Sequence, residues 1–258
     1  MELKKLNSIT KYPSILTYHT IGERGKLDSV HSEEKTFPID QKIYAYEKVD
    51  GENSRIILLN SDYSADYFIG SREELLYAKG DRIGNPYGNI ADFLNPLAEQ
   101  MDWIFRNDRD KALTVIYQES YGGKTKAAKN YTDNKTQGYR VFDVFSLTYS
   151  ELTSLLNLPI EKIAEWRDRG GQPFYSEKEK HEFINKWSLE AAPLVDEMKG
   201  SSFPLSLDNT YEYLKNFEKT KVGINTEGKS EGIIVRTHDR QMIRKIRFED
   251  YERTFRTR

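Results

Sequence analysis

The sequence predicts an α+β fold in which mainly antiparallel sheets are flanked by helices. Strand signals gather between residues 42 and 147, helical spacing dominates between 150 and 220, and two further strands joined by a short turn follow residue 231. Strands and helices that segregate along the chain in this way are typical of α+β folds rather than of folds with a regular βα repeat.

The composition is that of a globular chain. Its 258 residues are 37% hydrophobic and 31% charged, and 17 tyrosines and 12 phenylalanines argue against disorder. The absence of cysteine excludes a disulfide framework and a thiolate metal site. The N-terminus lacks the apolar core of a signal peptide, and no apolar run approaches the roughly 20 residues that span a bilayer. We therefore expect a cytoplasmic protein that makes no contact with a membrane.

The strands are expected after a polar, irregular segment that covers residues 1–40. Residues 42–49 alternate like a half-buried strand, Asp50-Gly51 is a hairpin-turn dipeptide, and residues 54–59 are expected to return beside the first strand. The apolar residues 139–147 predict a central strand. Further strands are predicted at 65–71 and 112–120, and at 231–237 and 241–248, which form a hairpin.

Helical signals occupy the remaining segments. Residues 71–79 predict a short helix with Ser71 as its N-cap, and residues 91–105 show helical spacing with a proline in the first turns, where it is best tolerated. Three or four helices are expected between 150 and 220. Two of them would begin with capping boxes, at Thr148/Glu151 and at Ser176/Glu179.

The strongest chemical signal is the segment Glu47-Lys48-Val49-Asp50-Gly51-Glu52-Asn53. A lysine at a strand end is followed by a tight turn, and its glycine permits the backbone to approach a bound phosphate. Lysine is a nucleophile when it is neutral, a state that burial or neighbouring cations favour. Taken alone, the segment also fits an ordinary hairpin with an exposed lysine.

Further segments follow in a fixed order. They are Ser71-Arg72, Glu119 ahead of Gly122-Gly123, Phe142-Asp143, Glu231 to Val235 (EGIIV), and Lys245-Ile246-Arg247. Each has a structural alternative: Phe142 fits a core position, Glu231 a turn carboxylate, and Lys245 a solvated edge strand. The ordered set is far more specific than any one member.

In this order the chain resembles the covalent nucleotidyltransferases across about residues 40–250. This superfamily comprises ATP-dependent DNA and RNA ligases and messenger-RNA capping enzymes. The resemblance implies the ATP-grasp-like fold of a ligase adenylation domain, with ATP and Mg²⁺ or Mn²⁺ as cofactors. It implies that Lys48 attacks the α-phosphorus of ATP, that Lys245 and Arg247 stabilise charge there, and that Phe142 stacks on adenine. Glu231 would bind a metal or the ribose region, and the remaining nucleotide contacts would come from Glu47, Asn53, Arg72 and Glu119.

Asn53, five residues after Lys48, resembles the K-x-x-G-x-N signature of the T4 RNA ligase 2 type. Two positions depart from that type, because Asp50 stands where histidine is frequent and Arg247 where lysine is usual. The resemblance implies RNA ends, including those in nicked duplexes, as the substrate. A small DNA ligase, a capping guanylyltransferase and a non-catalytic nucleotide- or RNA-binding module remain alternatives.

Eleven residues follow Arg247, too few for a C-terminal OB-fold or helical domain. We therefore expect a single adenylyltransferase domain over residues 1–258, with a helical insert at about 150–220. Such a domain would attach AMP to itself and seal ends weakly unless a partner supplied the missing domain. The net charge is −2, and a basic stretch at 122–140 fits either nucleic-acid binding or a solvated face. The four histidines lie far apart, which argues against a histidine metal site.

Overall fold

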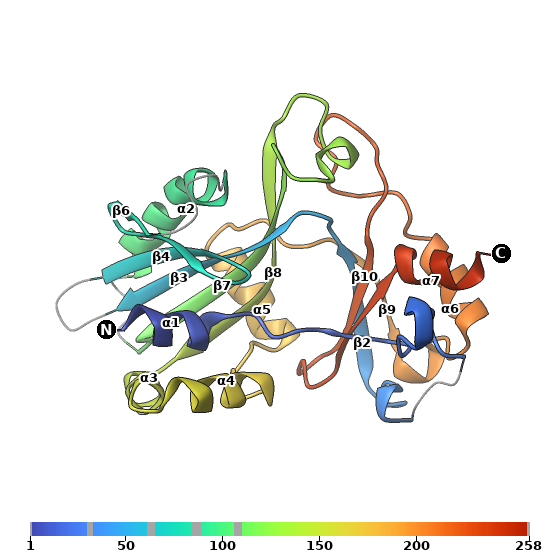
Figure 1. The fold of residues 1–258 in the computed structure, drawn as a ribbon, viewed down its shortest axis with the longest axis horizontal. Helices are drawn as coiled ribbons and strands as arrows, with labels where there is room; N and C mark the ends of the chain where they lie inside the picture. The colour runs from blue at the N-terminus through green and yellow to red at the C-terminus, as the bar shows by residue number, and fades with distance from the viewer. Residues whose placement is uncertain (1, 30–32, 61–64, 84–88, 106–109, 257–258) are drawn as a thin grey trace.

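The computed structural model describes residues 2–29, 33–60, 65–83, 89–105 and 110–256, which form two β-sheets with helices packed around them (Figure 1). The larger sheet has the strand order β6-β5-β4-β3-β7-β8, and the smaller sheet has the order β1-β11-β10-β2-β9. Neighbouring strands are antiparallel, except that β1 runs parallel to β11. This arrangement confirms the predicted α+β class.

The larger sheet contains β3 (Glu52–Asn60), β4 (Ala65–Ser71), β5 (Leu75–Ala78), β6 (Asp81–Arg82), β7 (Leu113–Gly122) and β8 (Gln137–Leu147). The smaller sheet contains β1 (Leu16–Thr17), β2 (Lys42–Lys48), β9 (Leu194–Lys199), β10 (Gly232–Thr237) and β11 (Ile243–Arg247). The α-helices are α1 (Leu3–Thr10), α2 (Asn89–Phe105), α3 (Tyr149–Leu156), α4 (Ile160–Asp168), α5 (Glu177–Lys186), α6 (Leu207–Lys215) and α7 (Phe248–Phe255). Short 3-10 helices lie at Glu23–Gly25, Glu33–Lys35, Ala128–Asn130 and Gly200–Ser202.

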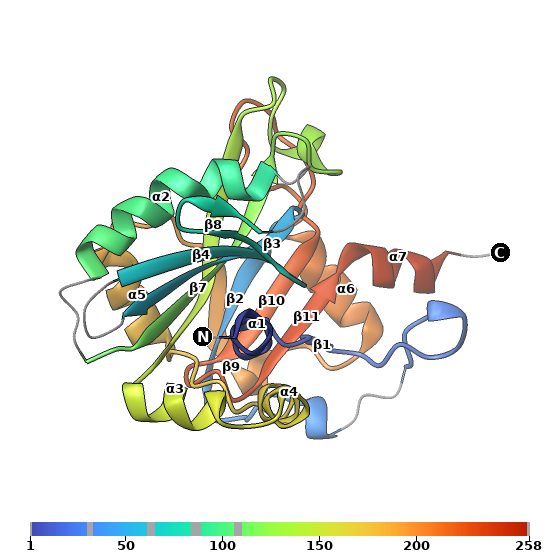
Figure 2. The same ribbon diagram turned by 60° about the vertical axis from the view of Figure 1, so that its left-hand side comes forward.

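Helices cover both faces of the larger sheet (Figure 2). Ile56 and Leu58 pack toward α2, whereas Ile57 packs on the opposite face, which α1, α3 and α4 cover. Because successive strand residues point to opposite faces, a strand that is buried on both sides needs an uninterrupted apolar run. The smaller sheet has its own core, in which Val235 and Ile246 pack with residues of α6 and α7.

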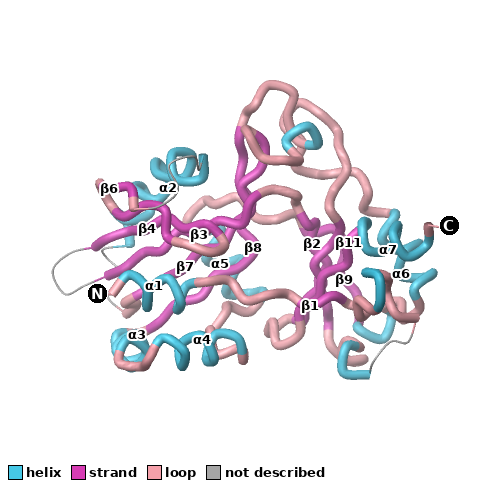
Figure 3. The backbone as a smooth tube through the Cα atoms, viewed as in Figure 1, coloured by secondary structure: helices cyan, strands magenta, loops and turns pink. Residues whose placement is uncertain are grey.

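The largest correction to the predicted fold concerns Asp50-Gly51. The predicted hairpin is wrong, because β2 pairs with β9 and β10 in the smaller sheet whereas β3 pairs with β4 and β7 in the larger one. The turn therefore carries the chain from one sheet to the other (Figure 3). A hairpin dipeptide predicts a change of direction, but the partner of the next strand depends on residues far away in the sequence.

Two further local predictions are wrong. Residues 71–79 do not form a helix: Ser71 accepts hydrogen bonds from the amides of Glu73 and Glu74, but the chain turns back as β5. Leu75 and Leu76 belong to the cores on opposite faces of the sheet, an arrangement that a strand provides and a helix does not. Strand β8, expected to be central, lies at an edge.

The chain beyond α4 covers the edge of β8, which explains the strand's apolar character. Isolated bridges join Val141 to Ala191 and Phe145 to Phe174. Within residues 150–220 the predicted helices are confirmed as α3 to α6, and both capping boxes form. Strand β9 in this region was not predicted, and neither was α1 in the segment expected to be irregular. In the part of the chain that the structure describes, no helix has the length and apolarity to cross a membrane.

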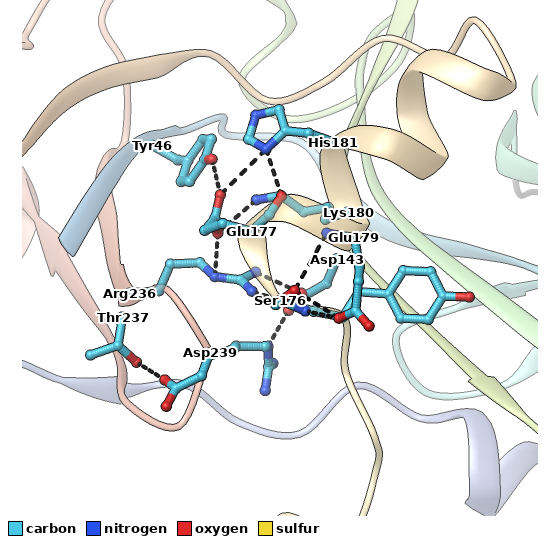
Figure 4. A network of polar contacts seen from close by, with 12 residues as sticks. Tyr46, Asp143, Ser176, Glu177, Glu179, Lys180, His181, Arg236, Thr237 and Asp239 are labelled. Carbon is cyan, nitrogen blue, oxygen red and sulfur yellow. Dashed lines mark hydrogen bonds and ion pairs between the residues drawn. The ribbon is translucent and has the colours of Figure 1, made fainter. Parts of the chain in front are cut away.

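A buried charged network joins the two sheets (Figure 4). Arg236 of β10 donates a hydrogen bond of 2.8 Å to Asp143 of β8 and lies 2.6 Å from Glu177 of α5. Lys180 and Tyr46 also contact Glu177. Burial disfavours ionisation of Asp143, but Arg240 and Arg236 hold its pKa below the usual value. The network therefore connects β8, β10 and α5 through buried charges, each of which is stabilised by an oppositely charged partner.

Candidate active site

A cavity of about 630 Å³ is lined by residues of both sheets. Eight of the nine predicted site residues line it: Glu47, Lys48, Asn53, Arg72, Glu119, Phe142, Glu231 and Lys245. They come from β2, β3, β7, β8, β11 and the segments just before β5 and β10. Residues that are spread over about 200 positions of the sequence thus surround one cavity of the size that ligand sites commonly have.

Lys48 is the last residue of β2, and its side chain is 24% exposed. Its amine donates a hydrogen bond to Glu231, whose own amide donates one of 3.1 Å to the Lys48 carbonyl. The next residue, Gly232, pairs with Lys48 in register and has a φ of 151°. A Cβ atom there would lie 2.1 Å from the carbonyl oxygen of Ile246, so only glycine allows β10 to start this close to β11.

The turn after Lys48 is fixed from two sides. The amide of Asp50 donates a hydrogen bond of 2.6 Å to the Tyr131 hydroxyl, and that of Gly51 donates one of 3.2 Å to Glu119. A Cβ on Gly51 would lie 2.2 Å from the carbonyl oxygen of Ser120, so the close approach of β7 requires glycine. The turn thus holds a defined backbone position beside the cavity.

The cavity offers one unused acceptor at the start of β3. The side-chain oxygen of Asn53 is buried and, among the described residues, has no hydrogen-bond partner. A buried polar group without a partner is costly unless a ligand or water satisfies it. Asn53 is therefore placed to accept a hydrogen bond from a bound molecule.

Cationic side chains concentrate around the Lys48 end of the cavity. Burial, and next the charges of Arg247, Lys48 and Arg72, lower the pKa of Lys245, which lies on β11 opposite Ile234 of β10. The Arg72 side chain is 57% exposed at the rim, where it donates a hydrogen bond of 3.3 Å to Ser14. Such a group of positive charges favours an anionic ligand such as a polyphosphate.

Arg247 is the one predicted residue that does not line the cavity. Its guanidinium donates two hydrogen bonds to Asp250, of 2.8 and 2.9 Å, and lies 3.9 Å from the carboxylate of Glu231. The structure thus places Arg247 behind Glu231, where its charge acts on that carboxylate. The predicted contact of Arg247 with the α-phosphate stays a prediction.

Glu47 lines the cavity next to Lys48, but its carboxylate is already bound on the side away from that lysine. It accepts hydrogen bonds from the Thr220 hydroxyl and from the amide of Lys221, at 2.8 Å in the second case. The residue as a whole is 3% exposed. The predicted nucleotide contact of Glu47 therefore stays a prediction, and the contacts observed fix the segment that leads into β10.

The aromatic side chains of Tyr12 and Phe142 also line the cavity. Phe142 of β8 is partly buried and packs edge-on against Tyr12, with ring centroids 5.1 Å apart. The Tyr12 hydroxyl donates a hydrogen bond of 2.7 Å to Asp143, which ties this ring to the network of Figure 4. Tyr12 was not predicted as a site residue, because no local pattern distinguishes it in a segment that folding brings to the cavity.

Glu119 makes the stability of the fold depend on pH. Burial, opposed by the charge of Lys48 and reinforced by that of Glu231, raises the pKa of Glu119 from 4.5 to about 7. The folded state therefore holds this proton more tightly than the unfolded state, and stability falls as pH rises from about 4.5 to about 7. Glu119→Gln is expected to remove this part of the pH dependence, measured as the urea midpoint of both proteins at pH 5 and pH 7.5. If the urea midpoints of the two proteins depended equally on pH, the raised pKa of Glu119 would not be the cause.

The protein supplies few metal ligands of its own. Among the described residues, no three histidine, aspartate or glutamate side chains come together as a metal site. His19, for example, is buried between Tyr251 and the Leu205 carbonyl, and His31 lies outside the described residues. Of the carboxylates that line the cavity, Glu231 and Glu119 flank Lys48 and are hard oxygen donors of the kind that Mg²⁺ and Mn²⁺ accept.

Comparison with known proteins identifies a matching family and similar folds. A model of the RNA ligase family matches residues 41–251, whereas no curated protein sequence matches the chain. A solved structure of Naegleria gruberi RNA ligase with PPi matches with a TM-score of 0.51 and 14% identity, over 94% of this chain and 63% of that one. A mutant of that ligase with AMP and Mn gives a TM-score of 0.55 at 14% identity, over 96% and 65% of the two chains. The chain thus spans less than two thirds of the length of these ligases.

Proposed function

The chain belongs to the RNA ligase family, and we propose that it is an ATP-dependent enzyme that activates and joins RNA ends. The proposal rests on one observation: Lys48, Glu231 and Lys245 line the same cavity. The aromatic rings of Phe142 and Tyr12 line it as well. Structures of Naegleria gruberi RNA ligase with ATP and Mn, similar in fold, support a nucleotide in this cavity. The finer likeness to the T4 RNA ligase 2 type stays a prediction.

The first step is attachment of AMP to Lys48. The neutral amine attacks the α-phosphorus of ATP, a P–N bond forms, and the bond to the bridging oxygen breaks so that pyrophosphate leaves. Glu231, which contacts the amine, is placed to accept its proton. Lys245 stabilises negative charge that develops on the phosphate oxygens, and Phe142 and Tyr12 hold the adenine ring.

Two further steps join the ends. The 5′-phosphate of an RNA attacks the phosphorus of the Lys48 adduct, which releases the amine and gives an RNA capped by AMP through a pyrophosphate bond. A 3′-hydroxyl then attacks the terminal RNA phosphate, a phosphodiester forms, and AMP leaves. One cavity that positions the adenylate serves all three steps, because the same AMP group is handled in each.

A divalent cation fits the donor set of the cavity. Mg²⁺ is commonly held by one or two carboxylates together with substrate phosphates, so the scarcity of protein ligands is what a nucleotide-bound ion needs. Glu231 is the carboxylate of the cavity that would hold Mg²⁺ or Mn²⁺. The ion would neutralise charge on the triphosphate and ease the departure of pyrophosphate.

The test is incubation with ATP or GTP labelled at the α-phosphate, followed by a denaturing gel. We expect a labelled protein with ATP and none with GTP, and we expect nicked duplexes to be joined when the strands are RNA in preference to DNA. A protein that binds ATP without forming an adduct would be a non-catalytic module, and the proposal would then be wrong. Joining of DNA nicks alone would favour a small DNA ligase.

A further inference from the structure

A basic surface stands beside the cavity and takes no part in the chemistry proposed above. We define the basic lobe as residues 122–137, between β7 and β8, together with residues 219–229, between α6 and β10. The two segments lie next to each other at the top of Figure 1 and again in Figure 2. They carry seven lysines and two acidic residues, in a chain whose net charge is −2.

The basic lobe is a packed unit. Tyr131 is 0% exposed and forms a small apolar core with Tyr121, Val222 and Val49. Its carbonyl accepts a hydrogen bond of 2.6 Å from the amide of Ile224, which ties the two segments together. A Cβ on Gly228 would lie 2.3 Å from the backbone of Asn130, so the second segment also lies directly against the first. The charges are therefore held on a defined scaffold.

The same scaffold fixes the basic lobe to the nucleophile. The Tyr131 hydroxyl accepts the amide hydrogen of Asp50, two residues after Lys48, and Val49 is part of the lobe's apolar core. Lys124, at the base of the lobe, lines the cavity itself. The lysine surface thus begins at the rim of the cavity and has a set position relative to Lys48.

The lysines differ in whether their charge is neutralised. Lys219 is paired with Glu227, and Lys229 with Glu218 and Glu252. The other five, Lys124, Lys126, Lys129, Lys135 and Lys221, are exposed and form no ion pair with the described residues. Like charges held close together on a folded scaffold repel one another, a cost that a polyanionic ligand would relieve.

We propose that the basic lobe binds the sugar-phosphate backbone of the RNA strand whose 5′ end enters the cavity. The inference rests on the proposed function, which supplies RNA as the substrate. RNA carries one phosphate per nucleotide, so a strand that runs from the cavity over the lobe meets successive lysines. Lysine is a flexible point charge that suits phosphate without regard to base, and we therefore expect binding independent of sequence.

The test compares a triple variant, Lys129→Ala/Lys135→Ala/Lys221→Ala, with the wild-type protein. Lys124 and Lys126 stay in place because the first lines the cavity and the second acts electrostatically on Asp50. Binding of a 5′-phosphorylated RNA oligonucleotide is followed by fluorescence anisotropy over a range of salt. We expect the slope of log K against log salt to fall by about 2, which weakens binding by about tenfold to a hundredfold at 0.1 M salt. Labelling of Lys48 with ATP alone is expected to be unchanged.

The matched control is Lys4→Ala/Lys26→Ala/Lys199→Ala, which removes the same charge at exposed positions outside the lobe. Equal weakening in both variants would show only an effect of net charge and would overturn the proposal. Displacement of the RNA by polyglutamate at equal charge would overturn it as well, because the surface would then bind any polyanion. If the wild-type protein binds RNA through the lobe yet forms no AMP adduct, the proposed function fails while the RNA-binding surface stands.

Discussion

Replacing Lys48 with methionine is expected to abolish attachment of AMP to the protein, with a loss of at least about 10⁴-fold in the rate of adduct formation. Methionine retains an unbranched stem of similar length but has no amine to attack phosphorus. Since the Lys48 side chain is partly exposed at the cavity, the substitution is expected to leave the fold intact. The measurement is the intact mass of the protein after incubation with ATP and Mg²⁺, with and without pyrophosphate to reverse the reaction.

Two comparisons make this prediction specific. Lys42→Met changes the first residue of the same strand, where the lysine is half exposed and paired with Glu197, and it should leave the adduct unchanged. An RNA that already carries the AMP cap needs no lysine nucleophile, so the Lys48→Met protein should still join it. An adduct of normal yield in Lys48→Met would mean that another amine, such as that of Lys245, is the nucleophile, and the proposed mechanism would be wrong.

The residues of the site could be predicted because the order of their motifs along the chain resembles that of the covalent nucleotidyltransferases. Lys48 ends β2 and Glu231 directly precedes β10, its antiparallel neighbour, so these two residues meet at one edge of the smaller sheet, whereas Glu119 lies near the end of β7 in the larger sheet. The ordered set indicates the chemistry of a lysine among cations and carboxylates through its resemblance to the covalent nucleotidyltransferases. The position of Arg247 could not be predicted. The residue that binds it, Asp250, lies in a helix that no prediction included.

The parts that failed depend on contacts between distant residues. Nothing local in Asp50-Gly51 distinguishes a hairpin turn from a crossing between sheets, since both require the same tight backbone. Ser71 carries the hydrogen bonds of a helix cap in a segment that is a strand, because Leu75 and Leu76 gain more from packing on two faces of the larger sheet. Tyr12 reaches the cavity only because α1 packs on that same sheet.

The network that joins the two sheets is expected to be the most sensitive part of the fold. Replacing Arg236 with alanine should lower the free energy of unfolding by about 3–5 kcal/mol, because it leaves Asp143 and Glu177 with one cation fewer in a buried site. Arg236 is 1% exposed, so water cannot replace the lost contacts without entering the core. Urea unfolding of both proteins, followed by far-UV circular dichroism, measures the difference.

The control is Arg253→Ala, which breaks an exposed pair with Glu249 four residues away on α7 and a hydrogen bond of 3.3 Å to the Gly25 carbonyl, and should cost under about 1 kcal/mol. The two arginines separate the effect of removing a charge from the effect of leaving buried partners unpaired. Because Asp143 also accepts the hydrogen bond of Tyr12, the Arg236 variant should in addition bind ATP more weakly at temperatures where it remains folded. A loss no larger than that of Arg253→Ala would mean that the apolar cores alone hold the two sheets, and that the cavity between them does not depend on the buried charges.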